Sequence, residues 1–421
     1  MKILHFADIH STDKDLDEIE KCLTFILNQA REINPDLIAM AGDFFNSQEV
    51  KLDSKAVKLI FEVFSALANI APVIGVIGTP SHDGKAAEVL EHIKAQYKII
   101  ISKKPELILY KQKHIIKHNH FEAHASDPDY NDVEAIISTL PTPTKQYLQM
   151  DGAILETDQL MAQRISEIFN AFGARASILN CPHIHIGHYQ IGGAFVSDTQ
   201  QLIGRDIEVS KDQVALMNAD VVCLGHIHKP QKIGDNIFYS GSIYRKDWGE
   251  LEEKGFYVHE IKTPTTLAPG LMIDFSEKLN SDFIKTPTRE LIKYQDDLTD
   301  ELMLENLNKR MNDLTNGIVD GENQHFKLTF NIYRDDVPKV NKKMILEKFK
   351  SAGCGNVKIE LIMIPRENIR SANFIKLKTL ADKMTEQAKL KAEEMPSGVL
   401  EKLEKLELTS SETIIKEVTA I

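Results

Sequence analysis

Acidic and histidine side chains occur in clusters along this chain, and the clusters tend to follow short apolar runs. The first cluster holds Asp8 and His10, and the last holds His226 and His228. Residues two positions apart point to the same side of an extended segment, so each pair could bind one ion. Carboxylate and imidazole ligands suit divalent transition metals. The two pairs therefore predict a metal site.

Further side chains of the same types lie between these pairs. Asp43 and His82 each follow an apolar run, and His188 ends a histidine-rich stretch. Short apolar runs predict buried strands, and open α/β sheets build their sites where parallel strands end. Asp and His side chains that converge there form the ligand set of a two-metal phosphoesterase.

The composition predicts a soluble globular protein of two or three domains. The chain has 421 residues, of which 43% are hydrophobic and 27% charged. No apolar run is long enough to span a bilayer, and a predicted strand so near the start leaves no room for a signal peptide. The four scattered cysteines lack zinc-motif spacing and predict reduced thiols. These features favour the cytoplasm.

The net charge of −12 argues against a basic DNA-binding surface over the whole chain. It does not exclude nucleic acid, because metal ions supply positive charge locally and a basic strip can coexist with an acidic total. A partner subunit could also carry most of the affinity.

Alternating strand and helix patterns predict a layered α/β domain in the first part of the chain. Apolar residues recur at helical spacing over residues 16–27 and 56–64, between the predicted strands. A further helix is expected over residues 160–172, followed by a strand over 176–179. Residues 326–332 alternate apolar and polar side chains, as half-buried strands do, in a second and smaller unit.

The end of the chain is rich in Lys, Glu, Leu and Ala. Apolar stripes over residues 375–384 and 400–406 predict two short amphipathic helices. Helices this short are marginal alone, so they either pack on their own domain or dock on a partner.

The order of the clusters resembles that of the calcineurin-type metallophosphoesterases: Asp-x-His, Gly-Asp, His-Asp, a lone Gly-His and Gly-His-x-His. More narrowly, the chain resembles the nuclease subunit of SbcCD-type DNA repair complexes, strongly over residues 1–260 and in layout beyond. The resemblance implies an α/β fold with a layered α-β-β-α nuclease sandwich at 1–268. It also implies a small α/β capping, DNA-binding domain at 269–370 and a helical partner-binding tail at 371–421.

The same resemblance implies metal ligands residue by residue. Asp8, His10 and His228 would bind the first ion, and Asp43 would bridge both ions. His226 would bind the second ion.

The remaining ligands of the second ion leave alternatives open. His188 matches the family's lone histidine, and His183 and His185 compete with it. The family usually has Gly-Asn-His-Asp at the third cluster, where the Asn oxygen binds metal, whereas this chain has Ser81 in a loop two residues longer. Ser81 would ligate directly, hold a water or leave the second site weak.

His82 and Asp83 are the catalytic candidates. The family's histidine at this turn faces the phosphate and assists the leaving oxygen, which His82 matches. Arg205, Lys229 and Arg245 lie near family-like motifs and are candidates for phosphate contacts, with a solvated surface position as the alternative for each.

Another histidine cluster is expected to be a solvated loop, because its surroundings are polar and irregular. Its members are His118, His120, Glu122 and His124.

These expectations describe a DNA nuclease, exonuclease or endonuclease, in an ATPase–nuclease complex for DNA end processing and repair. Two ions would activate water for attack on phosphorus; the family uses Mn²⁺, and Mg²⁺, Fe or Zn²⁺ would also be possible. Expected partners are DNA, an SbcC-type coiled-coil ATPase bound through the C-terminal helices, and a second copy in a homodimer, with no membrane. A small-substrate phosphodiesterase on the same fold, or a catalytically weak scaffold subunit, is the alternative.

Overall fold

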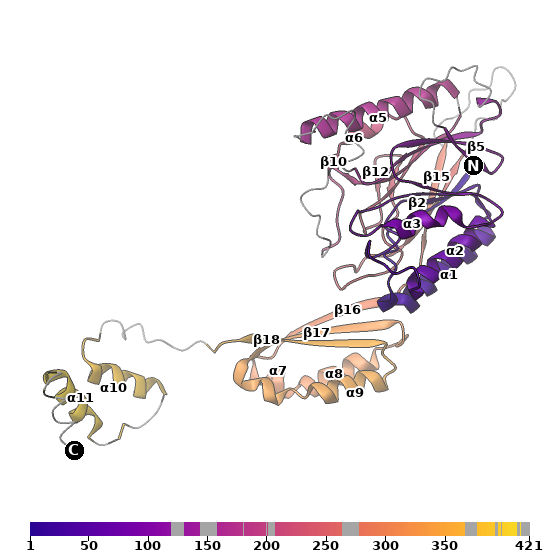
Figure 1. The fold of residues 1–421 in the computed structure, drawn as a ribbon. Helices are drawn as coiled ribbons and strands as arrows, with labels where there is room; N and C mark the ends of the chain where they lie inside the picture. Colours follow the sequence, from indigo (N-terminus) through magenta and orange to yellow (C-terminus); the bar gives the residue numbers. More distant parts are fainter. Residues whose placement is uncertain are drawn as a thin grey trace. The chain divides into compact units, whose positions relative to one another are not determined.

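Figure 1 shows the fold of the computed structural model as a ribbon coloured along the sequence. The chain divides into two compact units. The structure describes residues 1–118, 130–143, 158–179, 181–198, 200, 207–262, 278–366, 377–391, 395–396, 398–410 and 413. The first unit is Met1–Tyr294 with Arg310–Leu328 and Met344–Lys358, and the second is Gln295–Lys309 with Thr329–Lys343 and Ile359–Ile421. Two large sheets lie in the first unit.

The first sheet has six strands in the order β15-β14-β1-β2-β3-β4. Its strands are β1 (Lys2–Phe6), β2 (Leu37–Met40), β3 (Val73–Val76), β4 (Ile99–Ser102), β14 (Gly255–Ile261) and β15 (Leu279–Lys285). β1 to β4 run parallel, and β1, β2 and β3 confirm strands predicted from the apolar runs. β14 and β15 are antiparallel to their neighbours. β15 lies beyond residue 268 and pairs with β14 along its length.

The second sheet has seven strands in the order β12-β13-β11-β8-β7-β5-β6. Its strands are β5 (Glu106–Lys111), β6 (His114–His118), β7 (Ala135–Leu140), β8 (His183–His188), β11 (Val221–Gly225), β12 (Gln231–Ile233) and β13 (Ile237–Tyr239). The central strands β7, β8, β11 and β13 are parallel, so β8 and β11 end at the same edge. A separate two-stranded pair joins β9 (Gln190–Ile191) to β10 (Glu208–Val209).

Helices cover the outer faces of both sheets. The helices α1 (Leu16–Ile33) and α2 (Lys55–Ala68) bury their apolar faces with the first sheet, and α5 (Asp158–Leu179) buries its own with the second. Another apolar core lies between the two sheets. The expected α-β-β-α sandwich is therefore confirmed. The short elements are η1 (Asp13–Asp15), α3 (Lys85–Val89), η2 (Leu90–His92), α6 (Lys211–Ala215) and η5 (Arg334–Lys339).

The strand expected at residues 176–179 was wrong, because these residues form the last turn of α5. Phe169, Phe172 and Ala176 are all buried in the core beneath the helix. Their spacing of three and four residues continues one helical face, so residues 176–179 extend the helix that precedes them.

The small sheet has the order β16-β17-β18. Its strands are β16 (Glu290–Asp297), β17 (Gln324–Tyr333) and β18 (Asn356–Ile364), and its helices are α7 (Glu301–Glu305), α8 (Leu307–Asn316) and α9 (Lys342–Ser351). Alternate residues of β17 are buried, as its period-2 pattern predicted. Each of these three strands is divided between the two compact units, with one part of the strand assigned to each unit.

Two helices, α10 (Leu380–Lys391) and α11 (Val399–Leu408), contact each other near the end of the chain. Leu400, Leu406 and Leu408 of α11 are exposed. Residue 375, where the first apolar stripe was expected to begin, lies outside the described residues. Within the described part of the chain, no helix is both long and apolar enough to cross a membrane.

Candidate metal centre

The loops that follow β1, β2 and β11 carry the candidate ligands in an unusual backbone conformation. Asp8, His10, Asp43 and His226 have φ angles of 52°, 45°, 55° and 89°. Residues other than glycine rarely adopt this left-handed backbone conformation, and backbone strain of this kind concentrates at functional sites. The loops hold one another in place, because Asp8 N donates to Gly42 O at 3.0 Å and His10 N donates to Asp43 O at 3.0 Å.

One group of ligand atoms comes from Asp8, His10 and His228, which lie within 4.8 Å of one another. His10 Nε2 and His228 Nε2 are 2.9 Å apart. Burial holds the pKa of His10 well below its usual value, and its Nδ1 is buried with no hydrogen-bond partner among the described residues. At this distance two imidazole nitrogens repel each other if both carry lone pairs, so a proton or a cation must lie between them.

Glu250 determines how the ring of His228 is oriented. Its Oε1 lies 2.7 Å from His228 Nδ1, so this nitrogen donates to the carboxylate and Nε2 carries the lone pair towards His10. The other carboxylate oxygen accepts from Lys254 Nζ at 2.8 Å. Burial alone would raise the pKa of Glu250, but His228 and Lys254 lower it to about 2.

A second group of ligand atoms comes from Asp8, Asp43 and His188, again within 4.8 Å. His188 Nδ1 donates to Ala41 O at 2.7 Å, so its Nε2 faces Asp43 Oδ2 at 3.5 Å. Although burial opposes it, the Asp43 carboxylate raises the pKa of His188 to about 9. The surroundings of Asp43 thus attract positive charge in the middle of the cluster.

These groups fit divalent ions. His10, Asp43 and His82 form a third group of ligand atoms within 4.8 Å. Asp8 and Asp43 therefore each belong to two overlapping groups, as adjacent ions that share ligands require. The donors are carboxylate oxygens and imidazole nitrogens without a thiolate, a set that suits Mn²⁺, Fe or Zn²⁺.

His226 lies beside this cluster. Its ring centroid is 5.2 Å from that of His188, and its backbone N–H donates to both oxygens of Asp8 at 3.0 and 3.1 Å. Its ring nitrogens are not in any of the converging groups found among the described residues.

His82 and Asp83 occupy different places. His82 Nδ1 lies 2.8 Å from Asp43 Oδ2, and its side chain is 28% exposed, so it lies at the solvent side of the cluster. Asp83 is buried and accepts N–H groups at 2.8 to 3.2 Å, two on each oxygen, from the following residues: Asp43, Phe44, Phe45 and Gly78. Asp83 therefore holds together the backbone segments that carry Asp43 and Gly78. Burial and the neighbouring Asp43 raise the pKa of Asp83 to about 7.

The structure does not bring Ser81 to the cluster. Ser81 is exposed, and its carbonyl accepts from Gln48 N at 2.9 Å. Thr79 lies there instead: its N donates to Asp43 Oδ1 at 2.6 Å, and its hydroxyl is 3.3 Å from Asp43 Oδ2 and 3.4 Å from His188 Nε2. The chain turns after Thr79, whose carbonyl accepts from His82 N at 2.8 Å and from Asp83 N at 3.0 Å.

The competing histidines of β8 lie elsewhere. His183 Nε2 and His185 Nδ1 each bond Ser138 Oγ at 2.8 Å, and Tyr189 Oη bonds His185. Both rings are buried, and the ring of His185 packs against Phe169 and Phe172 of α5. Of the three histidines, His188 at the end of the strand is the one in a converging group of ligand atoms. The alternation of residues along β8 could have distinguished them in the sequence, because His183 and His185 lie on one face of a strand and His188 on the other.

The candidates for phosphate contacts differ in their surroundings. Arg245 donates from its guanidinium to the backbone oxygens of Arg289, Leu251 and Glu252, so it connects loops. Lys229 Nζ lies 5.8 Å from the ring centre of Phe195. Arg205 lies outside the described residues.

The other histidine cluster is only partly described. His118 is buried and bonds Tyr130 Oη at 2.9 Å, so it is not in a solvated loop, whereas His120, Glu122 and His124 lie outside the described residues.

Sequence reasoning missed the residues that support the cluster. Lys246 lies near it, since burial lowers the pKa of Lys246 while Asp43 and Glu250 act in the opposite direction. Gln200 Oε1 accepts from His228 N at 3.0 Å. Neither residue has a spacing pattern that distinguishes it from a surface side chain.

Comparisons with known proteins agree with this geometry. Residues 1–230 match the family model described as calcineurin-like phosphoesterase. The SbcD subunit of the nuclease SbcCD from Staphylococcus epidermidis is 27% identical over 82% of this chain and 83% of its own length, and its counterpart from Staphylococcus saprophyticus is 25% identical over 62% and 66%. One solved crystal structure aligns with 68% of this chain and 98% of its own at 12% identity, with a TM-score of 0.35. The family model spans more than half of the chain and both carboxylates shared by the ligand groups, so the chain belongs to the calcineurin-like phosphoesterases, a family of metal-dependent hydrolases.

Proposed function

We propose that this protein is a DNA nuclease that hydrolyses phosphodiester bonds with two divalent ions, Mn²⁺ in the first place. The observation that carries the proposal is the sharing of Asp8 and Asp43 between overlapping groups of ligand atoms. Two adjacent ions in such a site supply Lewis acidity that activates water and offsets charge on the phosphoryl oxygens.

The residues divide into ligands and supports. Asp8, His10 and His228 would hold the first ion, with Glu250 fixing the ring of His228. Asp43 would be shared by both ions.

The second ion would take His188 and His226. Thr79 replaces Ser81 as the source of a hydroxyl beside this position, because Thr79 Oγ1 lies near both Asp43 and His188. A hydroxyl is a weaker ligand than an amide oxygen, so this ion would be the more weakly bound of the two.

His82 is the proposed catalytic residue. Its Nδ1 is engaged with the Asp43 carboxylate, and the ring is partly exposed at the solvent side of the cluster. Nε2 is then available to donate a proton to the leaving oxygen of the phosphodiester. Asp83 would act by holding the loop that carries Asp43.

DNA is favoured over a small substrate by the extent of the similarity. The similarity to the SbcD protein of S. epidermidis extends over 82% of this chain, well beyond the phosphoesterase region at residues 1–230. A small substrate would need no such additional segments. A DNA substrate also agrees with a cytoplasmic location.

We further propose that the tail at residues 371–421 binds a coiled-coil ATPase of SbcC type, and that the protein forms a homodimer. The exposed leucines of α11 support a docking role. The expected nuclease domain ends at residue 268; because β15 pairs with β14, we propose that this domain extends to the end of β15 and that the capping domain follows it.

The test is hydrolysis of linear DNA with Mn²⁺, compared with hydrolysis of a chromogenic phosphodiester. We expect the DNA to be degraded and activity to disappear with EDTA. Full activity in excess EDTA would contradict the two-metal site. Hydrolysis of the small diester without any DNA cleavage would favour the small-substrate phosphodiesterase, and no hydrolysis of either would favour a scaffold subunit.

A further inference from the structure

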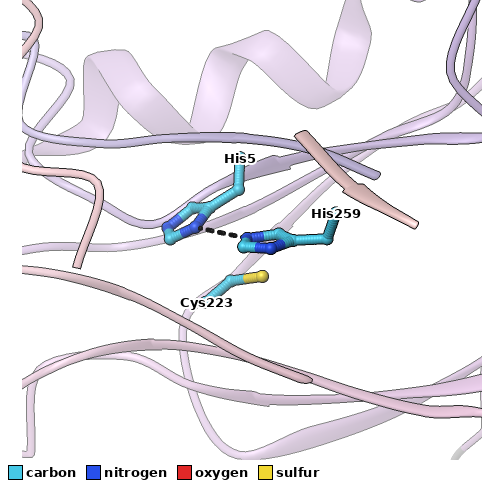
Figure 2. Close-up of side chains that lie close together, drawn as sticks. All are labelled: His5, Cys223 and His259. Carbon is cyan, nitrogen blue, oxygen red and sulfur yellow. Dashed lines mark hydrogen bonds between the residues drawn. The ribbon is translucent and has the colours of Figure 1, made fainter. Parts of the chain in front are cut away.

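A second group of potential ligands is buried between the two large sheets, apart from the candidate metal centre. It consists of His5 on β1, His259 on β14 and Cys223 on β11, all 0% exposed. Figure 2 shows the two rings close together, with the cysteine extending towards them from the other sheet. The ligand atoms of the three residues lie within 4.8 Å of one another.

The strand periodicity explains why these polar groups face each other. On β1, Ile3 belongs to the core between the sheets and Leu4 to the core under the helices, so His5 faces the other sheet. The same alternation applies to β14, and Cys223 is itself in the core between the sheets. Two imidazoles and a thiol therefore interrupt an otherwise apolar layer, where polar groups without partners are costly.

The hydrogen bonds of the two rings leave one nitrogen of each directed at the other. His5 Nε2 donates to Leu224 O at 3.2 Å, because a carbonyl can only accept. Burial lowers the pKa of His5 to about 3, so the ring is neutral and its Nδ1 carries a lone pair. His259 Nε2 lies 3.2 Å from this Nδ1, and His259 Nδ1 lies 2.8 Å from Ser281 Oγ.

We propose that His5 Nδ1, His259 Nε2 and Cys223 Sγ form a buried binding site for one thiophilic d¹⁰ cation, Zn²⁺ or Cu⁺. Thiolate and imidazole are the ligands that such cations prefer. Two nitrogens bound to one tetrahedral zinc would be about 3.3 Å apart, given Zn–N bonds of about 2.0 Å, and the two nitrogens here are 3.2 Å apart.

The partners of the two rings are those that metal-bound histidines have. A ligating imidazole usually donates its other N–H to a carbonyl, carboxylate or water, which fixes the ring, and Leu224 O and Ser281 Oγ can both accept. Without an ion, the Ser281 hydroxyl would donate to His259 Nδ1, and His259 Nε2–H would donate to His5.

Binding requires a balanced movement of protons. The Cys223 thiol loses its proton to solvent and becomes a thiolate, and the His259 proton moves from Nε2 to Nδ1. The Ser281 hydroxyl then accepts rather than donates. With Cu⁺ the charges of ion and thiolate cancel, and with Zn²⁺ one positive charge remains. In either case the ion would connect the two sheets across their shared core, independently of the function proposed above.

The test uses Co²⁺ as a spectroscopic substitute for Zn²⁺ in the full-length protein, expressed in cobalt-supplemented minimal medium. A thiolate ligand gives Co²⁺ a sulfur-to-metal charge-transfer band, and the carboxylate–histidine centre has no thiolate. We expect this band in the wild type and in Cys22→Ala, which removes a buried cysteine elsewhere. We expect its loss, with about one fewer cobalt ion per chain, in Cys223→Ala.

The same variants are loaded with Cu⁺ under anaerobic conditions against a competing chelator, which distinguishes the two cations. Cys223→Ser serves as a second variant of similar size, so that loss of the band is measured in a folded protein. The proposal is overturned if cobalt reaches the protein without a charge-transfer band and no Cu⁺ is retained in a Cys223-dependent manner. It is also overturned if the band survives in Cys223→Ser, and the three groups then form a neutral hydrogen-bonded core.

Discussion

Replacing Glu250 by Gln should destabilise the protein and weaken its metal centre at the same time. Glu250 is 1% exposed, and both of its oxygens accept hydrogen bonds, one from His228 and the other from Lys254. A Gln side chain has the same shape but only one oxygen. In either orientation of the Gln side chain, its NH₂ group would face the N–H of His228 or the ammonium of Lys254, both of which are also donors. The buried Lys254 ammonium would also lose one of its two carboxylate partners.

The size of the effect follows from the pKa of Glu250, which is lowered from 4.5 to about 2. At about 1.4 kcal/mol per pH unit, this corresponds to roughly 3 kcal/mol of stability at neutral pH. Because the folded pKa is the lower one, the contribution is complete above about pH 4.5 and disappears as the pH falls towards 2. The freed ring of His228 should also weaken metal binding by about 10- to 100-fold.

Urea unfolding of the wild type and Glu250→Gln in EDTA measures the first effect, and Mn²⁺ titration calorimetry measures the second. Glu252→Gln is the matched control, since Glu252 also contacts Lys254 at 2.8 Å but is 19% exposed, and we expect a loss below about 1 kcal/mol. The reasoning is refuted if Glu250→Gln unfolds with the wild-type free energy at pH 7, or if a difference between the two proteins persists unchanged at pH 3.

Three further outcomes are expected. His82→Ala should abolish DNA cleavage yet retain metal, whereas Asp43→Ala should lose metal; equal losses by elemental analysis would make His82 a ligand. Thr79→Asn should tighten the weaker Mn²⁺ site several-fold in calorimetry, because a carbonyl oxygen replaces a hydroxyl, while Ser81→Asn should leave it unchanged; the reverse result would restore Ser81 to the centre. Deleting residues 371–421 should preserve Mn²⁺-dependent cleavage of short single strands but remove co-purification with the ATPase, and an unfolded product would show that the tail belongs to the protein's own core.

The sequence predicted the strands and the convergence of ligand-type residues because both depend on local patterns. A short apolar run specifies a buried strand, and parallel neighbours bring Asp8 and Asp43 to one edge. The position of Ser81 depends instead on the conformation of a loop of unusual length, in which the Ser81 carbonyl accepts from Gln48 N, and no periodicity predicts such a contact. The supporting role of Glu250 is equally non-local, since it arises from a contact 22 residues away along the chain.

Two predictions from local sequence patterns were incomplete or wrong, one for the histidines of β8 and one for the end of α5. The histidines of β8 alternate with isoleucine, so the strand period decides which of them share the α5 face of the sheet and which share the face with Ile184 and Ile186. Treating all three histidines of β8 as alternative ligands ignored this difference between the two faces of the strand. At residues 176–179 a strand was expected where the helix continues, because four residues are too few to show a helical period.

The left-handed backbone at Asp8, His10, Asp43 and His226 has a consequence for how this protein can be engineered. Each such residue costs about 1–2 kcal/mol relative to a relaxed conformation, and glycine would remove most of that cost. A library selected only for heat resistance should therefore accumulate glycine at these four positions and lose hydrolysis as it does so. Selection for thermal tolerance and selection for turnover act in opposite directions at the same codons, so a stabilised variant of this protein has to be sought elsewhere in the chain.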